Sequence, residues 1–362
     1  MKFMVAKVLF LTGKKKQLIT FAKKDTMTSK ERVYARINNQ PVDRIPNLNI
    51  LMFFAAKEIG VPYSEYCRDY RKLVHGNIVC MQKYGIDAVS AISDPLRESA
   101  DMGLNIEFPV DDVPHEKEFL IREKSDLLKL KPVSPENGRR MCDRLLAVDL
   151  FKKEVGNEFP IIGWVEGCFA MAADLRGVNQ FLVDLYEDPD FVVDLLEICL
   201  EQATVFAHAQ IVVGADIIGV GDAIASVAGP LAYNDLALQY EVRLLEAIRK
   251  AGGMTKLHIC GNTTPFLESL PAQQCDILDL DWMVPIDRAV ELYGDITCIN
   301  GNYDPVAILL QGNVEDVKSA VKKCAGMGGK KHASSAGCEV PRQTPPANLM
   351  AVFDTLCELG EF

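Results

Sequence analysis

Short apolar and β-branched stretches alternate with longer amphipathic stretches along most of the chain. Apolar runs of about four to eight residues between polar residues or glycines are typical of buried strands, whereas apolar residues three and four positions apart are typical of helices. The clearest helical pattern covers residues 190–213, where Phe191, Leu195, Ile198 and Ala209 fall at helical spacing. The pattern predicts eight strands, over residues 44–50, 87–93, 160–166, 216–222, 255–260, 276–281, 296–300 and 331–337.

Strands and helices that alternate in this way predict an α/β fold, a single (β/α)8 TIM barrel. A doubly wound open sheet is the alternative. We prefer the barrel because PNLNILMFF, at the first predicted strand, lacks a glycine-rich phosphate-binding fingerprint. We expect the barrel to cover residues 27–362, with an inserted loop and helical region at about 95–159. Residues 1–26 are expected to be a poorly ordered or accessory extension, and Thr28 or Ser29 is expected to cap the first helix.

Composition narrows the class of protein. Hydrophobic residues make up 49% of the 362 positions, enough for a large core. The formal net charge of -11 argues against a globally basic nucleic-acid-binding protein. We find no apolar run of about 18 residues or more, so we expect no membrane span. The 11 cysteines are odd in number and scattered, which is typical of a reducing compartment, so we expect a cytoplasmic location.

Polar residues close most of the predicted strands. They are Asn47, Asn49, Asp94, Glu166, Asp222, His258, Cys260, Asp279, Asp281, Asn300, Asn302 and Cys338. Because the carboxyl ends of barrel strands build the active site, this distribution is what an enzyme shows. For any single residue of this set, a role in a turn or a cap is an equally good explanation.

A His-x-Cys pair is the sharpest local feature. Residues two apart on a strand point to the same face, so His258 and Cys260 are expected to converge at the barrel mouth. Cys338 follows the last predicted strand, and barrel closure would bring it to the same rim. Three N and S ligands with an open fourth position are the pattern of a catalytic zinc site. The alternative is a hydrogen-bonded core histidine beside two small buried cysteines.

Four segments carry a family resemblance: ERVYARINNQPVDRIP, SDP after the second predicted strand, LDLDW around the sixth, and GCEVPRQTPPANL near the end. In these segments the chain resembles the uroporphyrinogen decarboxylase superfamily, whose fold is a (β/α)8 barrel. One branch comprises decarboxylases, which have an RQAGRY-like motif after the first strand. Here residues 51–57 contain no arginine, Ala173 stands at the position of a tyrosine, Cys338 stands at the position of a histidine, and only Asp94 matches.

The other branch comprises zinc-dependent methylcobamide:coenzyme M-type methyltransferases, whose ligand motif matches His258, Cys260 and Cys338. This resemblance implies bound Zn²⁺, a methylcobamide supplied by a partner corrinoid protein, and a small-molecule acceptor that is a thiol or a folate. We expect catalytic roles for Asp94 and Glu166. For acceptor binding we expect Asn47, Asn49, Asp222, Asp281 and Asn300. Uroporphyrinogen decarboxylase activity and a non-catalytic corrinoid-protein-binding barrel remain the alternatives.

Overall fold

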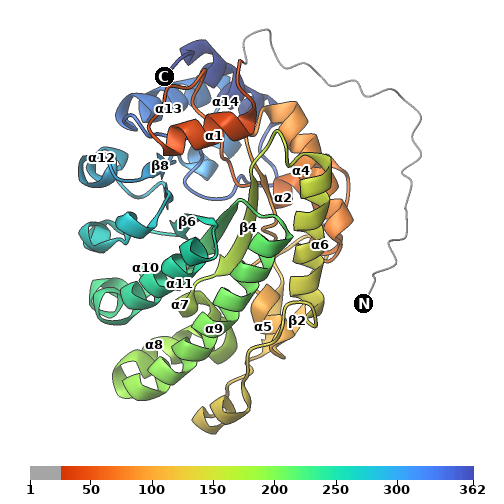
Figure 1. Ribbon diagram of the computed structural model, residues 1–362, viewed down its shortest axis with the longest axis vertical. Coiled ribbons are helices and arrows are strands. Elements are labelled where there is room, and N and C mark those ends of the chain that lie inside the picture. Colours follow the sequence, from red (N-terminus) through yellow and green to blue (C-terminus); the bar gives the residue numbers. More distant parts are fainter. Residues whose placement is uncertain (1–25) are drawn as a thin grey trace.

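The computed structural model describes residues 26–362, which form a parallel strand core surrounded by helices (Figure 1). Six strands pair in the order β1-β4-β5-β6-β7-β8. Their bounds are β1 Val89–Ser90, β4 Ile161–Glu166, β5 Ile217–Gly221, β6 Met254–Ile259, β7 Ile277–Leu280 and β8 Cys298–Asn300. Each was predicted from its apolar run, and the (β/α)8 barrel class is confirmed.

The first and eighth predicted strands close the barrel as extended segments with single bridges, not as ladder strands. Asn47 bridges Ser334, and Ala333 bridges Asn300 of β8. The amide of Asp87 donates to the carbonyl of Asn47 at 2.8 Å, which connects the first segment to β1. Regular pairing fails here because Pro46 has no N–H and because the side chain of Asn49 accepts the backbone N–H of Ala336 at 2.8 Å.

The core has two parts. An apolar cluster inside the barrel includes Ile162, Trp164 and Ile217, and a larger cluster fills the layer between the strands and the helices. Trp164 of β4 lies against β5, where a Cβ on Gly219 would come within 2.2 Å of its ring. Glycine at this position therefore makes room for the indole inside the barrel.

The outer helices follow the expected alternation with the strands. Their bounds are α4 Tyr70–Tyr84, α6 Arg139–Glu154, α9 Pro189–Val213, α11 Leu238–Lys250, α12 Ile286–Tyr293, α13 Val314–Met327 and α14 Pro346–Leu359. The shorter helices include α2 Phe53–Glu58, α3 Tyr63–Tyr66, α7 Cys168–Arg176, α8 Val178–Glu187 and α10 Ala223–Ala232. Five further turns are 3₁₀ or π in character, η1 Lys124–Lys129, η2 Tyr233–Ala237, η3 Thr264–Ser269, η4 Ala272–Gln274 and η5 Pro305–Leu310. Across residues 26–362, no helix combines the length and apolar character needed to cross a membrane.

Helix α1 (Ser29–Ile37) closes the amino-terminal end of the barrel. Thr28 caps it with a capping box to Glu31, which confirms one of the two predicted caps. Arg32 pairs with the buried carboxylate of Asp87 at 2.8 Å, and the guanidinium of Arg36 donates to the carbonyl of His332. The first contact joins α1 to the start of β1, and the second joins α1 to the last barrel segment.

The region expected as an insert contains α5 (Arg97–Asp101), an antiparallel hairpin of β2 (Asn105–Glu107) and β3 (His115–Glu118), η1 and α6. Helix α6 packs against α4 and α9. The boundaries of the barrel and its insert stay predictions. The extension predicted at residues 1–26 lies, up to residue 25, outside the described residues.

Candidate metal centre

Three predicted ligands meet at the carboxyl end of the barrel. The ligand atoms of His258, Cys260 and Cys338 all lie within 4.8 Å of one another. His258 Nε2 is 3.0 Å from Cys260 Sγ, and the Sγ atoms of Cys260 and Cys338 are 3.8 Å apart. Gly261 follows with a φ of 94°, a conformation that favours glycine and turns the chain away after β6. These three residues could hold one metal ion.

Neighbouring strands fix the imidazole of His258. Its Nδ1 lies 3.2 Å from the carbonyl oxygen of Asp279 on β7 and 3.5 Å from the Asp279 carboxylate. Lys256 Nζ, from the same face of β6, is 2.9 Å from that carboxylate, and Asn300 Nδ2 of β8 donates to its other oxygen. All four side chains are buried. A ring that donates from Nδ1 leaves Nε2 as the lone-pair atom that faces the cysteines.

The electrostatics of the triad favour a cation. Burial lowers the pKa of His258, but interactions with Cys338 and Asp279 outweigh this effect and raise the pKa to about 9. The hydrogen bond with Cys260, together with burial, raises the pKa of Cys338. The Cys338 thiol therefore resists ionisation on its own, and a bound dication would reverse that balance.

A cavity of about 220 Å³ opens beside the triad. Its lining includes His258, Cys260 and Cys338, apolar groups such as Met52 and Trp164, and four acidic residues. The acidic residues are Asp94, Glu166, Asp222 and Glu339. The structure thus brings the three predicted ligands together with both predicted catalytic carboxyl groups and with one predicted acceptor-binding residue, Asp222.

Two of these carboxyl groups are paired with buried arginines. Arg140 forms an ion pair with Asp94, and Arg97 Nη2 lies 2.8 Å from Glu166 Oε1. Burial alone would raise the pKa of Asp94, but Arg140 and Arg97 hold it below its usual value. Burial raises the pKa of Glu166 to about 8, although Arg97 acts in the opposite direction. Glu98 adds to this rise because it places a second carboxyl beside the same arginine.

The other two carboxyl groups cap helices. Asp222 accepts the backbone N–H of Ala170 at 2.8 Å, at the start of α7. Glu339 accepts the backbone N–H of Phe53 at 2.7 Å, at the start of α2. Burial raises the pKa of Asp222 to about 7 and that of Glu339 to about 8, despite these hydrogen bonds. Both carboxyl groups are therefore held in place by the fold while they face the cavity.

Four residues expected to bind an acceptor lie outside the cavity lining, and their side chains are engaged elsewhere. Asn47 and Asn49 bond to each other at 2.7 Å, and Asn49 also donates to the hydroxyl of Tyr303. Asp281 accepts the backbone N–H groups of Gly261 and Met283. The fourth, Asn300, donates to Asp279. These four side chains support loops and strand ends, and their role in acceptor binding stays a prediction.

Sequence reasoning missed several groups that shape the site. Glu339 follows Cys338 directly, and this adjacency was the available signal. Arg97 and Arg140 lie in the region expected as an insert, and Lys256 stands two positions before His258 on one strand face. Lys256 could have been predicted, because residues two apart on a strand share a face and His258 lies on that face.

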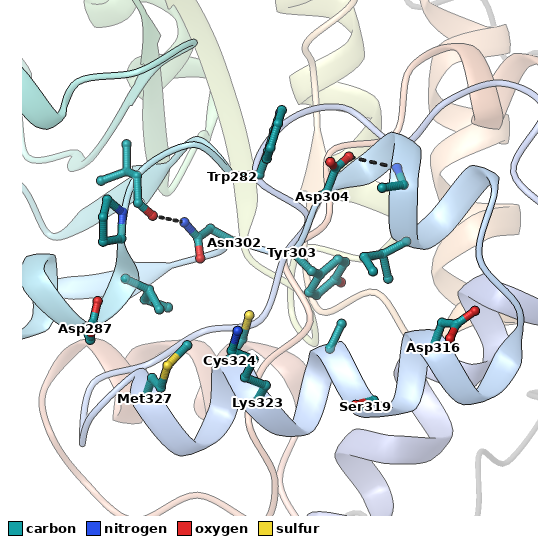
Figure 2. A pocket seen from close by; sticks show the side chains of 16 residues that line it. Trp282, Asp287, Asn302, Tyr303, Asp304, Asp316, Ser319, Lys323, Cys324 and Met327 are labelled. Atoms are coloured by element: carbon teal, nitrogen blue, oxygen red, sulfur yellow. Dashed lines mark hydrogen bonds between the residues drawn. The ribbon is translucent and has the colours of Figure 1, made fainter.

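A larger cavity, of about 620 Å³, lies outside this site between the loops after β7 and β8, η5 and α13 (Figure 2). Figure 2 shows Trp282, Asn302 and Asp304 facing Lys323 and Met327 of α13 across it. The lining of this larger cavity contains no His–Cys–Cys set. Of the polar residues at the ends of the predicted strands, Asn302 alone lines it, and the side-chain amide of Asn302 donates to the carbonyl of Val284 at 2.6 Å. The smaller cavity beside the triad is therefore the candidate site.

A comparison with family models identifies the fold family. The model described as uroporphyrinogen decarboxylase (URO-D) matches residues 28–359. The chain belongs to the uroporphyrinogen decarboxylase family. Methylcobamide:CoM methyltransferase MtbA of Methanosarcina mazei is 31% identical over 337 residues, which cover 90% of this chain and 97% of that protein. A uroporphyrinogen decarboxylase of Carboxydothermus hydrogenoformans is 26% identical over 313 residues, which cover 84% of this chain and 88% of that protein.

Solved structures agree on the fold. A methyltransferase from Methanosarcina mazei superposes with a TM-score of 0.84 at 23% identity, over 92% of this chain and 99% of that chain. A B12-independent methionine synthase from Shewanella sp. W3-18-1 gives a TM-score of 0.54 at 16% identity, over 87% of this chain and 97% of that chain. The family includes more than one chemistry, so the activity has to be argued from the site.

Proposed function

We propose that this chain is a zinc-dependent methyltransferase that moves a methyl group from the methylcobamide of a corrinoid protein to a small thiol. The geometry of the triad carries the proposal. Two sulfurs bound to one tetrahedral zinc ion at about 2.3 Å lie about 3.8 Å apart. The Sγ atoms of Cys260 and Cys338 have that separation, 3.8 Å, and His258 supplies the nitrogen donor.

The donor set suits the chemistry. One imidazole and two thiolates fit Zn²⁺, and three protein ligands leave a fourth position open. Zn²⁺ held there would lower the pKa of an acceptor thiol, which is near 8.5 in the free state. His258 is kept in the required tautomer by Asp279, and Lys256 and Asn300 hold that carboxylate in place.

His258, Cys260 and Cys338 would hold the Zn²⁺ that keeps the acceptor sulfur a thiolate, and the partner's methylcobamide would supply the methyl group to this sulfur and retain the electron pair of the carbon–cobalt bond. The acceptor thiol would lose its proton on binding, and Glu166, which lines the same cavity, is the candidate group to receive it. The sequence similarity to methylcobamide:CoM methyltransferase MtbA over 90% of the chain supports the donor assignment. We retain Asp94 and Glu166 as candidate catalytic residues, because both line the cavity.

The size of the cavity favours a thiol over a folate. About 220 Å³ falls below the range of about 300–1,000 Å³ typical of pockets for drug-sized ligands. The lining also argues against uroporphyrinogen, a tetrapyrrole with eight carboxylates, because it contains no lysine or arginine that could pair with them.

The test combines metal analysis with turnover. Purified protein is expected to contain about one zinc per chain and to demethylate methylcobalamin in the presence of a thiol. Cys338→Ala should lose most of both, while Cys142→Ala, a half-buried cysteine on α6, should keep them. Metal-free wild-type protein after gentle purification would contradict the proposal. Turnover of uroporphyrinogen, or a corrinoid-protein complex without turnover, would favour one of the two alternatives.

A further inference from the structure

Two uncharged segments border the candidate metal centre at the carboxyl end of the barrel. Residues 223–234, which follow β5, and residues 282–286, which follow β7, contain no Asp, Glu, Lys or Arg, although charged residues make up 25% of the chain. Both segments leave large apolar side chains in solvent: Val227 is 60% exposed, Trp282 45% and Met283 42%. Apolar side chains that gather on a surface in this way are typical of a binding face.

Two of these side chains lie beside Cys260. Val227 follows Ser226 on α10, and the hydroxyl of Ser226 donates to the carbonyl of Cys260 at 2.6 Å. Met283 reaches the turn after Cys260, because its Cε lies 4.0 Å from the position that a Cβ would take on Gly261. The exposed parts of α10 and of the loop after β7 therefore meet at the first cysteine of the triad.

Trp282 lies beside the second cysteine. A Cβ on Gly337, the residue before Cys338, would come within 2.0 Å of the backbone nitrogen of Trp282, so the two loops touch and glycine allows the close approach. The indole borders the larger cavity on its other side (Figure 2). Val227, Trp282 and Met283 thus form an apolar rim that adjoins both cysteines.

The proposed methyl transfer requires the donor to approach this rim. Reacting atoms have to come within about 3–3.5 Å of each other, so the methyl carbon must reach an acceptor sulfur at the His258–Cys260–Cys338 triad. The cavity beside the triad has a volume of about 220 Å³, which is small even for a drug-sized ligand. A corrin ring with its amide side chains is larger, so it has to lie across the surface around the triad.

The polarity of the rim matches this occupant. The face of a corrin ring is apolar, and its edge carries neutral amide groups. An uncharged rim can cover such a face without burying an unpaired ion, which would be costly. Trp and Met are also among the residue types that are enriched in the buried parts of binding surfaces. A neutral macrocycle therefore fits the rim better than a charged partner surface does.

We propose that Val227, Trp282 and Met283 form the docking surface for the corrin face of the methylcobamide donor, and that they align its methyl group with the triad. This inference rests on the proposed function and makes it more specific, because it names the residues that receive the donor. The structural basis is the position of this apolar rim beside both Cys260 and Cys338.

Equilibrium dialysis with methylcobalamin, in the absence of a thiol, measures donor binding without turnover. Val227→Glu and Met283→Glu each place a carboxylate where the corrin face would cover it. Each is expected to raise the dissociation constant about tenfold or more, and a tenfold rise corresponds to about 1.4 kcal/mol. Trp282→Ala should act in the same direction, whereas Met283→Leu should keep the wild-type affinity. The side chains at positions 227 and 283 are exposed, so the fold should tolerate these changes.

Val212→Glu is the matched control. Val212 is 71% exposed on α9, and α9 ends just before β5 begins, so this side chain lies at the end of the barrel away from the triad. The variant has the same added charge as Val227→Glu but should bind methylcobalamin like the wild type. In turnover assays the three weakened rim variants should raise the KM for methylcobalamin, while zinc content and the KM for the thiol stay unchanged.

The outcomes separate the inference from the proposed function. Equal dissociation constants for the wild type and the rim variants, an equal loss in Val212→Glu, or no binding by the wild type would overturn the inference. Weaker binding in the rim variants without any methyl transfer by the wild type would sustain the docking surface and contradict the proposed function. Methyl transfer with an unchanged KM for methylcobalamin in the rim variants would leave the proposed function intact and refute the inference.

Discussion

Removal of the Asp279 carboxylate should weaken metal binding without any change to a ligand. Asp279 holds His258 Nδ1 through its carbonyl and its carboxylate, and the carboxylate lies 2.9 Å from the buried Lys256 ammonium. In Asp279→Asn the backbone contact stays, but the charge that stabilises the imidazole orientation is lost. Partners of this kind typically change metal affinity by about 10–100-fold, or about 1.4–2.7 kcal/mol.

The same substitution should also destabilise the fold. At 2.9 Å and an effective dielectric constant of about 20, the Coulomb energy of the Lys256–Asp279 pair is about 6 kcal/mol. Desolvation offsets part of this energy, and removal of one partner from a buried pair typically costs about 3–5 kcal/mol. Both side chains are 1% exposed, so water cannot take over the missing partner.

The assay is competition for zinc against a chelator of known affinity, with circular dichroism as a check on folding. Asp276→Asn is a matched control at the other end of β7, where the carboxylate accepts the backbone N–H of Thr255 far from the triad. It should leave zinc affinity unchanged. The double variant Lys256→Met, Asp279→Asn should recover part of the lost stability but not the zinc affinity. Unchanged zinc affinity in folded Asp279→Asn would refute the reasoning.

Two further predictions concern the barrel interior and the pH dependence of stability. Gly219→Ala places a Cβ within 2.2 Å of the Trp164 ring, so we expect a loss of about 1–3 kcal/mol and a shift in tryptophan fluorescence; an unchanged melting temperature would contradict this packing. Glu166 has its pKa raised by burial to about 8, so the folded chain keeps a proton that the unfolded chain releases near pH 4.3. The contribution of Glu166 to stability should therefore fall as the pH rises from about 4 to about 8. Glu166→Gln should reduce the difference in melting temperature between pH 5 and pH 8. An equal difference in the variant and the wild type would show that Glu166 does not cause the pH dependence.

Much of the site could be predicted because it depends on simple periodicities. The alternation of strand side chains places His258 and Cys260 on one face, and closure of a barrel brings Cys338 to them from 78 residues away. The same reasoning located Asp94, Glu166 and Asp222 at strand ends that face the cavity. These positions follow from the backbone alone.

The sequence pattern could not predict side-chain directions that are decided by hydrogen bonds. Asp281 ends a strand like Asp222, but its carboxylate turns to the N–H groups of Gly261 and Met283. Asn49 takes a backbone N–H that a ladder strand would have used, so its segment closes the barrel through a single bridge. Neither choice can be read from spacing, because each depends on donors that come from elsewhere in the fold.

X-ray absorption at the zinc edge tests the central claim most directly, because it reads the ligands of the bound ion. The account predicts one nitrogen at about 2.0–2.1 Å and two sulfurs at about 2.3 Å from His258, Cys260 and Cys338, with a third sulfur when an acceptor thiol is added. A spectrum with only nitrogen and oxygen ligands, or no sulfur gained on thiol addition, would contradict it.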